Sequence, residues 1–328
     1  MNLVSTPLRI SFVGGGTDFK AWFEDNQGSV ISCAIDQYVH ALFGNLSPIW
    51  GSNYKFTYSK LEEVKTINEI KHPLIRECFR KWAPSGRRIS LLYASDMPGN
   101  SGLGSSSAFC NSINLGLNIL QNDELLSSKV LAERSIHIER EVLGENGGWQ
   151  DQIATAYGGF NEIKFQKDHF SVNPLPTEFI NSYLSQCVLI QVGHLRQAHI
   201  VSKGQLLGMK AMKDKYLEMM ELTSNAISSI HSNNLNEFSE IIDKSWELKA
   251  QMSELISNPT IDDAVSKLKE LGASGIKLLG AGSGGFLLAR FEKGINMEIL
   301  KQNNFGYVTK INPDFSGATL NYRTIPNQ

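Results

Sequence analysis

Apolar and polar residues alternate near the N-terminus, where Leu8, Ile10 and Phe12 are separated by polar neighbours. A period of two predicts a β-strand with one apolar face, and three glycines at residues 14–16 end it. Arg9 lies on the opposite face of this strand. Two interpretations of Arg9 stay open: a solvated strand residue, or a fixed cation facing a phosphate cleft.

A second pattern joins a strand to a helix. The run Arg88–Ala94 has strand character, and Phe109, Ile113 and Leu117 recur at helical spacing. Residues 98–107 between them are rich in glycine and serine. Such a loop points several backbone N–H groups at one spot, where the positive end of the helix dipole also attracts an anion. The pattern favours a phosphate-binding loop, and an ordinary capped helix after a flexible turn is the alternative.

The chemistry of this loop suits a nucleoside triphosphate. Its glycines let the main chain approach a ligand closely, and its last three serines offer hydroxyls to a helix cap, to phosphate oxygens or to a magnesium ion. No lysine stands where a Walker loop requires one, which excludes the P-loop fold. The candidate nucleotide-binding residues are Pro98, Gly99, Asn100, Ser101, Gly102, Leu103, Gly104, Ser105, Ser106 and Ser107.

Three carboxylates stand at or near glycine turns. Asp18 follows Gly-Gly-Gly-Thr, which is either a tight turn with an Asx cap or a close-approach loop that presents a carboxylate to sugar hydroxyls. Glu139 lies on a helix predicted over residues 127–144, and Asp151 begins an element after a second glycine turn. Most carboxylates cap helices or lie on the surface, and that alternative stays open for each of them.

A third glycine-rich segment lies near the C-terminus. Gly280, Gly282 and Gly285 satisfy the Gly-x-Gly-x-x-Gly pattern of dinucleotide-binding loops. That pattern should open a helix, with an acidic residue about 20 positions later. Here an apolar strand at residues 286–291 follows the glycines instead. The context therefore predicts a strand–loop–strand hairpin over residues 276–291.

Length and composition narrow the class of protein. The 328 residues suffice for two domains, and we place the domains at 1–175 and 176–328, where the sequence turns polar and contains prolines. A net charge of −2 provides no basic surface for nucleic acid or a membrane. The four cysteines are too far apart for a zinc site or a disulfide framework, which indicates a cytoplasmic protein. A homodimer stays possible.

Three segments resemble the motifs of the GHMP kinases, the superfamily of galactokinase, homoserine kinase, mevalonate kinase and phosphomevalonate kinase. Residues 98–107 are similar to the second motif, residues 7–18 to the first and residues 277–286 to the third. The three motifs occur in the order that the family has. The resemblance implies an α/β (α+β) chain with a ribosomal-protein-S5-like N-terminal domain, a ferredoxin-like C-terminal domain and a cleft between them.

Within the superfamily the chain looks most similar to the D-glycero-D-manno-heptose 7-phosphate kinases and the fucokinases. The resemblance implies that Asp151 is the catalytic aspartate and that Arg9 stabilises the moving phosphoryl group. It also implies that the glycine loop holds ATP, and that Ser106 and Glu139 bind Mg²⁺. The implied substrate-binding residues are Gly15, Gly16, Thr17, Asp18, Gly159, Arg196 and Gly282.

The function implied by the resemblance is ATP-dependent phosphorylation of a sugar. The expected acceptor is the C1 hydroxyl of D-glycero-D-manno-heptose 7-phosphate, which gives the 1,7-bisphosphate for nucleotide-activated heptose and surface polysaccharide. Such an acceptor needs a second basic pocket, for which Arg196, Lys203 and His194 are candidates. The alternatives are a fucokinase or another C1 sugar kinase, and a non-catalytic sugar- or nucleotide-binding protein on the same fold.

Overall fold

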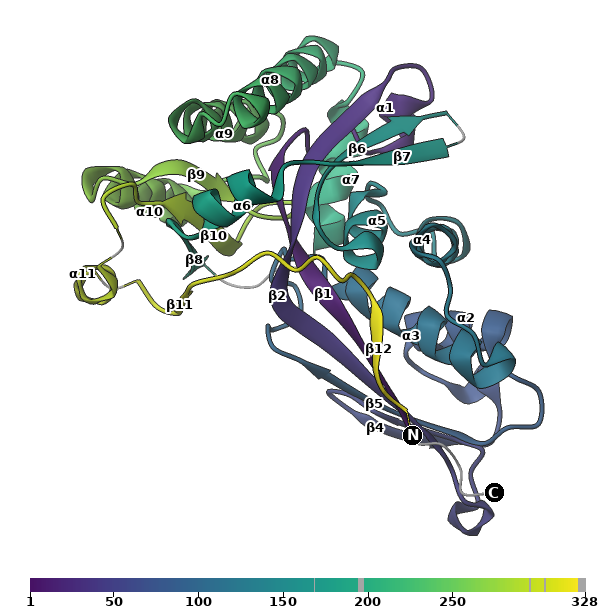
Figure 1. The fold of residues 1–328 in the computed structure, drawn as a ribbon. Helices are drawn as coiled ribbons and strands as arrows, with labels where there is room; N and C mark the ends of the chain where they lie inside the picture. The colour runs from purple at the N-terminus through teal and green to yellow at the C-terminus, as the bar shows by residue number, and fades with distance from the viewer. Residues whose placement is uncertain (168, 194–197, 295, 304, 324–328) are drawn as a thin grey trace.

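The chain is organised around two separate β-sheets (Figure 1). The computed structural model describes residues 1–167, 169–193, 198–294, 296–303 and 305–323. Within these residues the first sheet has eight strands and the second has four. Helices accompany both sheets, so the mixed α/β class predicted from the sequence is present.

The larger sheet is built on one long strand, β2 (Gly28–Asn45). The first part of β2 pairs with β6, its last part pairs with β5, and β1 runs antiparallel along its other side. The sheet order is β12-β1-β2-β5-β3-β4, and β7 extends it beyond β6. The other strands of this sheet are β1 (Asn2–Val13), β3 (Tyr54–Thr57), β4 (Leu61–Val64), β5 (Ile89–Ser95), β6 (Phe160–Gln166), β7 (His169–Pro174) and β12 (Thr319–Arg323).

Helices α2 to α5 lie on one side of this sheet, to the right of the strands in Figure 1. The central helix of the group, α3, packs on β1 and β2. Gly116 of α3 makes this close packing possible, because a Cβ at this position would lie 2.0 Å from Cε2 of Phe43. The helices of this half are α1 (Lys20–Phe23), α2 (Pro73–Trp82), α3 (Ser105–Asn122), α4 (Ser128–Ile136) and α5 (Gln150–Tyr157).

Strand β1 is buried on both of its faces, whereas the alternating pattern predicted one polar face. Arg9 is only 4% exposed and Ser11 only 8%. The loop before α3 packs on Arg9, Gln150 of α5 contacts Ser11, and the second half of the chain covers the end of the strand, where Lys277 donates a hydrogen bond to the carbonyl oxygen of Phe12 at 2.5 Å. Arg9 is therefore not a solvated strand residue, and its guanidinium needs partners inside the protein.

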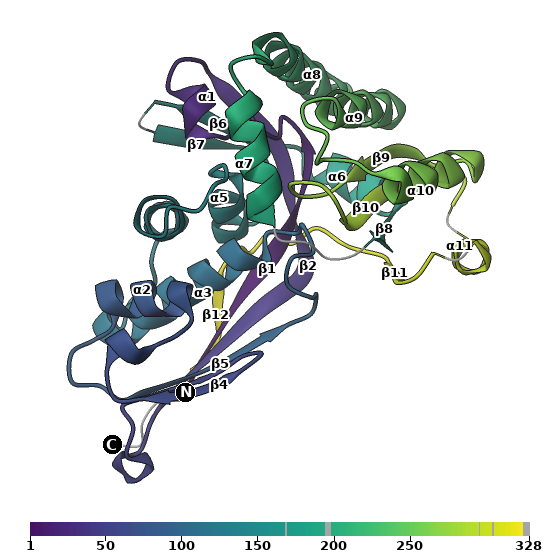
Figure 2. The same ribbon diagram turned by 180° about the vertical axis from the view of Figure 1, so that it is seen from behind.

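The smaller sheet is antiparallel, in the order β11-β8-β10-β9. The hairpin predicted over residues 276–291 is present as β9 and β10, which are joined by the glycine loop at residues 279–284. The strands are β8 (Cys187–Val192), β9 (Ser274–Leu278), β10 (Gly285–Arg290) and β11 (Val308–Thr309). Helix α9 packs on β9, and α8 packs on α9 (Figure 2).

The helices of the second half are α6 (Thr177–Leu184), α7 (Ala198–Gly208), α8 (Lys213–His231), α9 (Leu235–Ala250), α10 (Pro259–Glu270) and α11 (Met297–Gln302). In the part of the chain that the structure describes, no helix combines the length and the apolar character needed to cross a membrane. All four cysteines are buried free thiols, in agreement with the sequence analysis.

The last described strand returns to the first sheet. Strand β12 pairs antiparallel with β1, and Ile35 of β2 forms an isolated bridge with Pro313. The domain division at residues 175 and 176 stays a prediction. A division at a single point does not describe the strand pairing fully, because β12, near the C-terminus, belongs to the sheet of the N-terminal half.

We expect Gly116→Ala to destabilise the protein, although alanine normally favours a helix. Its Cβ would overlap the ring of Phe43, and overpacking of a core typically costs about 1–3 kcal/mol. Gly208→Ala is the matched control, since a Cβ at the end of α7 would meet only Met252 O, at 4.0 Å. Thermal unfolding should show a lower midpoint for the first variant alone. Equal midpoints would contradict the packing argument.

Candidate active site

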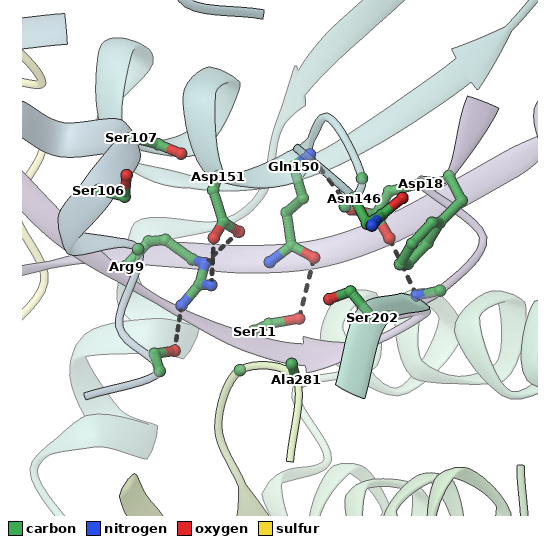
Figure 3. A pocket seen from close by; sticks show the side chains of 18 of the residues that line it. Arg9, Ser11, Asp18, Ser106, Ser107, Asn146, Gln150, Asp151, Ser202 and Ala281 are labelled. Atoms are coloured by element: carbon green, nitrogen blue, oxygen red, sulfur yellow. Dashed lines mark hydrogen bonds and ion pairs between the residues drawn. The ribbon is translucent and has the colours of Figure 1, made fainter. Parts of the chain in front are cut away.

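A cavity of about 200 Å³ opens where the glycine loop before α3 meets the loop of the β9–β10 hairpin. Residues of β1, α3, α5, α7 and α9 line it, so both halves of the chain contribute. Figure 3 shows Ser106 and Ser107 on one side with Arg9 and Asp151 next to them, Gln150 in the middle, and Asp18 with Asn146 on the other side. The hairpin loop, marked by Ala281, closes it from a third side.

The two glycine loops touch through their backbones. A Cβ at Gly102 would lie 2.5 Å from the carbonyl oxygen of Leu279, and one at Gly280 would lie 2.5 Å from Cα of Gly102. Both glycines have positive φ angles, 81° and 80°, which residues with side chains rarely adopt. The glycines are therefore required at these two positions for close approach as well as for conformation.

Arg9 and Asp151 form a bidentate ion pair in the cavity. Nε of Arg9 donates to Oδ1 of Asp151 at 2.8 Å, and Nη2 donates to Oδ2 at 2.7 Å. The remaining nitrogen, Nη1, donates to the carbonyl oxygen of Gly102 at 2.7 Å. The Arg9 side chain is 5% exposed and that of Asp151 is 31% exposed, so the carboxylate faces the open space while the guanidinium is buried.

Glu139 lies beside the start of α3. It belongs to a π-helical turn, His137–Val142, and its side chain is almost completely buried. Ser106 and Ser107 donate hydrogen bonds to its two carboxylate oxygens at 2.9 and 2.7 Å, and Gln152 donates to one of the same oxygens. This arrangement places a charged oxygen ligand and two hydroxyls at the N-terminus of a helix, where an anion is also favoured.

Asp18 is held at the opposite end of the cavity. Its carboxylate accepts hydrogen bonds from the backbone N–H groups of Gly16, at 2.9 Å, and Gln150, at 3.3 Å. Burial, and to a lesser extent the charge of Asp151, raise the pKa of Asp18 above its ordinary value. Gly148 leaves room for this carboxylate, because a Cβ there would lie 1.8 Å from Oδ2 of Asp18.

Two buried lysines line the same cavity, and the sequence patterns did not point to either. Lys249 of α9 donates to the carbonyl oxygen of Gly280 at 2.6 Å, and Lys277 of β9 donates to Phe12 as described above. Burial lowers the pKa of Lys249 to about 8, against the opposing effect of Asp18. Burial, with the nearby charges of Lys249 and Arg9, also lowers the pKa of Lys277 strongly.

Several other polar side chains at the Asp18 end were not expected from the sequence. Gln150, Gln205 and Ser202 line the cavity and are each more than nine-tenths buried. Nε2 of Gln150 and Nε2 of Gln205 find no hydrogen-bond partner among the described residues. Gln150 directly precedes Asp151 in the second glycine turn, whereas no local motif marks Ser202 and Gln205, which α7 brings to the cavity only in the folded chain.

Most of the predicted site residues meet at this cavity. Those that line it are Arg9, Gly15, Gly16, Asp18, Asn100, Gly102, Gly104, Ser105, Ser106, Ser107, Glu139 and Asp151. Those that do not line it are Pro98, Gly99, Ser101, Leu103, Thr17, Gly159 and Gly282. Arg196 and His194 lie outside the described residues, and Lys203 is an exposed residue of α7 away from the lining.

Three of the residues that do not line the cavity, Thr17, Gly159 and Gly282, have contacts within the protein. The hydroxyl of Thr17 donates to the carbonyl oxygens of Gly14 and Ser29, and the N–H of Gly159 donates to that of Asp314. Gly282 packs on the backbone of Ile256, which a Cβ would approach to 2.7 Å. These contacts shape the loops, and the assignment of Thr17, Gly159 and Gly282 to substrate binding stays a prediction.

Comparison of the chain with known proteins shows that it is a phosphotransferase that has an alcohol group as acceptor. Two models of one family match the chain, GHMP kinases N terminal domain over residues 68–159 and GHMP kinases C terminal over residues 226–304. The chain belongs to the GHMP kinase family, whose members are ATP-dependent kinases. The predicted fold and enzyme class are thereby confirmed.

Individual relatives support the assignment of the chain to this family. The chain is 30% identical, over 86% of its length and 87% of the relative's, to D-glycero-alpha-D-manno-heptose 7-phosphate kinase of Campylobacter jejuni. Its fold is similar to that of a D-glycero-D-manno-heptose 1-phosphate kinase from Bacteroides thetaiotaomicron, with a TM-score of 0.79, 21% identity and coverage of 99% and 100% of the two chains. A putative sugar kinase from Campylobacter jejuni has a TM-score of 0.73, with 25% identity and 97% coverage of both chains.

The buried ammonium of Lys249 predicts a pH-dependent stability. Its pKa is about 8 in the folded chain and near 10.5 when solvated, so between these values the unfolded chain binds more protons and stability rises with pH. We expect Lys249→Met to stabilise the protein at pH 7 by on the order of 1–2 kcal/mol, because it removes a buried charge. Urea denaturation should show this gain shrinking between pH 8 and 10.5. A constant difference would contradict the prediction.

Proposed function

We propose that this chain is an ATP-dependent kinase that phosphorylates the C1 hydroxyl of D-glycero-D-manno-heptose 7-phosphate. The observation that carries the proposal is the Arg9–Asp151 pair in a cavity between two glycine loops. Phosphoryl transfer asks a protein mainly to position two substrates and to neutralise charge. A buried cation beside a half-open carboxylate meets both needs.

The choice of acceptor is supported by the activity of a relative. The relative with 30% identity is a kinase of a heptose 7-phosphate, a heptose that already carries one phosphate and keeps its C1 hydroxyl free. A second group of relatives is less similar in sequence. It includes a bifunctional fucokinase/GDP-fucose pyrophosphorylase of Arabidopsis thaliana, to which the chain is 24% identical. Fucose is therefore the alternative acceptor within the same class.

The glycine loop is the proposed site of the ATP phosphates. Gly102, Gly104 and Ser105 bring backbone into the cavity at the start of α3, where the helix dipole favours negative charge. Mg²⁺ prefers oxygen ligands and is commonly held by one or two carboxylates plus substrate phosphates. Ser106 and Glu139 offer a hydroxyl and a carboxylate of this kind and would hold the ion, which neutralises charge on the phosphates when it is bound.

Asp151 and Arg9 would carry the chemical step. Although Arg9 occupies both oxygens of Asp151, each oxygen keeps a further lone pair toward the cavity. The acceptor hydroxyl gives its proton to this carboxylate as its oxygen bonds to the terminal phosphorus, and the bond from that phosphorus to the bridging oxygen breaks to release ADP. Arg9 stabilises the negative charge that develops on the phosphoryl group.

The Asp18 end of the cavity is the proposed acceptor site. Asp18 accepts hydrogen bonds from sugar hydroxyls, and Gly15 and Gly16 let the ring approach the backbone. Asn146 lies beside Asp18 and Gln150 lies between Asp18 and Asp151, and both also line the cavity (Figure 3). The unpaired Nε2 of Gln150 suits a ligand rich in oxygen acceptors.

Asp151→Asn should leave ATP binding nearly intact while turnover falls by about 10²–10⁴-fold, the usual contribution of a positioned proton acceptor. Asp263→Asn, an exposed change on α10, is the control and should retain wild-type turnover. The measurements are nucleotide affinity by titration and the rate of ADP release. Turnover of Asp151→Asn within threefold of wild type would remove this residue from the mechanism.

A panel of sugars and sugar phosphates, assayed for ADP release with ATP and Mg²⁺, tests the acceptor. We expect D-glycero-D-manno-heptose 7-phosphate to give the highest kcat/KM and the product to carry a new phosphate at C1, as phosphorus NMR would show. Faster reaction of unphosphorylated fucose would refute the named acceptor and leave the enzyme class intact. Binding of ATP and sugar with no ADP release from any acceptor would instead favour a non-catalytic protein.

A further inference from the structure

Lys249 is a buried cation that has no carboxylate within ion-pair distance among the described residues. Its ammonium carries three N–H donors, and one of them is used, by the carbonyl oxygen of Gly280. Arg9 differs in this respect, because Asp151 neutralises it directly. Lys249 therefore brings to the cavity a positive charge and hydrogen-bond donors that the protein itself leaves unmatched.

The position of this ammonium is next to both proposed substrate loops. Its Nζ lies 3.9 Å from the point where a Cβ of Gly15 would stand, in the loop that leads to Asp18. Its partner Gly280 lies against Gly102 of the phosphate loop. A ligand atom that contacts Lys249 is consequently within reach of the region where the two substrates meet.

The surrounding groups make this charge costly without a ligand. Burial removes the solvent that would otherwise stabilise the ammonium, and Arg9 adds positive charge nearby, whereas Asp18 and Asp151 oppose these effects without forming an ion pair with it. Two side-chain N–H groups that line the same cavity, Nε2 of Gln150 and Nε2 of Gln205, have no hydrogen-bond partner among the described residues. A set of unmatched donors and one unmatched cation is complementary to an anion that has several oxygen atoms.

We propose that the ammonium of Lys249 binds a phosphate oxygen of the bound substrates, as a second cation of the site beside Arg9. The inference rests on the proposed kinase function and deepens it. Two sources supply such an oxygen, the terminal phosphoryl group of ATP and the phosphate that the acceptor itself carries. The hydrogen bond to Gly280 fixes the direction of the side chain, and the other two donors face the ligand.

Two variants separate this role from a structural one. Lys249→Met removes the charge and the hydrogen bond, whereas Lys249→Gln removes the charge and keeps a donor for Gly280. Lys244→Met changes an exposed lysine on the same helix and is the control. Loss of a charged hydrogen bond to phosphate is worth about 10- to 100-fold, so we expect both Lys249 variants to lose that much kcat/KM. Rescue by glutamine to within threefold of wild type would overturn the proposal.

Separate measurement of kcat, the Kd for ATP and the KM of the acceptor identifies which phosphate Lys249 binds. With the acceptor that the panel identifies, a rise of tenfold or more in the Kd for ATP, or a fall in kcat, assigns Lys249 to the terminal phosphoryl group. A rise in the KM of the acceptor with unchanged ATP affinity assigns it to the phosphate of the acceptor. Changes below threefold in all three constants would overturn the proposal, given melting temperatures that show both variants to be folded.

The pH dependence gives an independent readout. Since kcat/KM reports groups of the free enzyme, wild-type kcat/KM should fall as pH rises through about 8, where Lys249 loses its proton. This fall in kcat/KM should be absent from the pH profile of Lys249→Met. An unchanged fall in that variant would count against the proposal. Wild-type enzyme without any ADP release would instead refute the kinase function itself, which keeps the two failures distinct.

Discussion

The contact between the backbones of Gly102 and Gly280 is the constraint on which the rest of the site depends. It joins the loop before α3 in the first half to the hairpin loop in the second half. Gly285 adds to it, since a Cβ there would lie 2.7 Å from the carbonyl oxygen of Ser101. Because no side chain fits between the loops, their main chains form one continuous surface, and functional side chains enter the cavity from the strands and helices behind them.

Arg9 connects this surface to the interior of the cavity. Its backbone N–H donates to the carbonyl oxygen of Leu103 at 2.9 Å, and its guanidinium binds Gly102 and Asp151. A single residue therefore fixes the positions of β1, the loop at residues 98–107 and the first turn of α5 relative to one another. A shift of any one of these elements would change the geometry of the ion pair, so positioning and charge stabilisation in this site have a common origin.

The sequence predicted those parts of the site that are encoded by local patterns. The loop at residues 98–107, the hairpin over 276–291 and the place of Asp151 at the start of a helix all follow from spacing and glycine content within short segments. Lys249 and Gln205 could not be predicted in this way, because each lies in an ordinary amphipathic helix and reaches the cavity only through tertiary packing. The choice between the two interpretations of Arg9 was left open for a related reason, since its partners Gly102 and Asp151 are distant in sequence.

The distribution of charge explains why these unpredicted residues matter. The pair of Arg9 and Asp151 is neutral as a unit, so it does not by itself attract an anion strongly. Asp18 and Lys249 are both buried, and burial shifts the pKa of each toward its uncharged form. A fold selected for stability alone would replace such groups with apolar ones. Their presence in one cavity supports the proposal that the bound substrates supply further partners, hydroxyls for Asp18 and phosphate oxygens for Lys249.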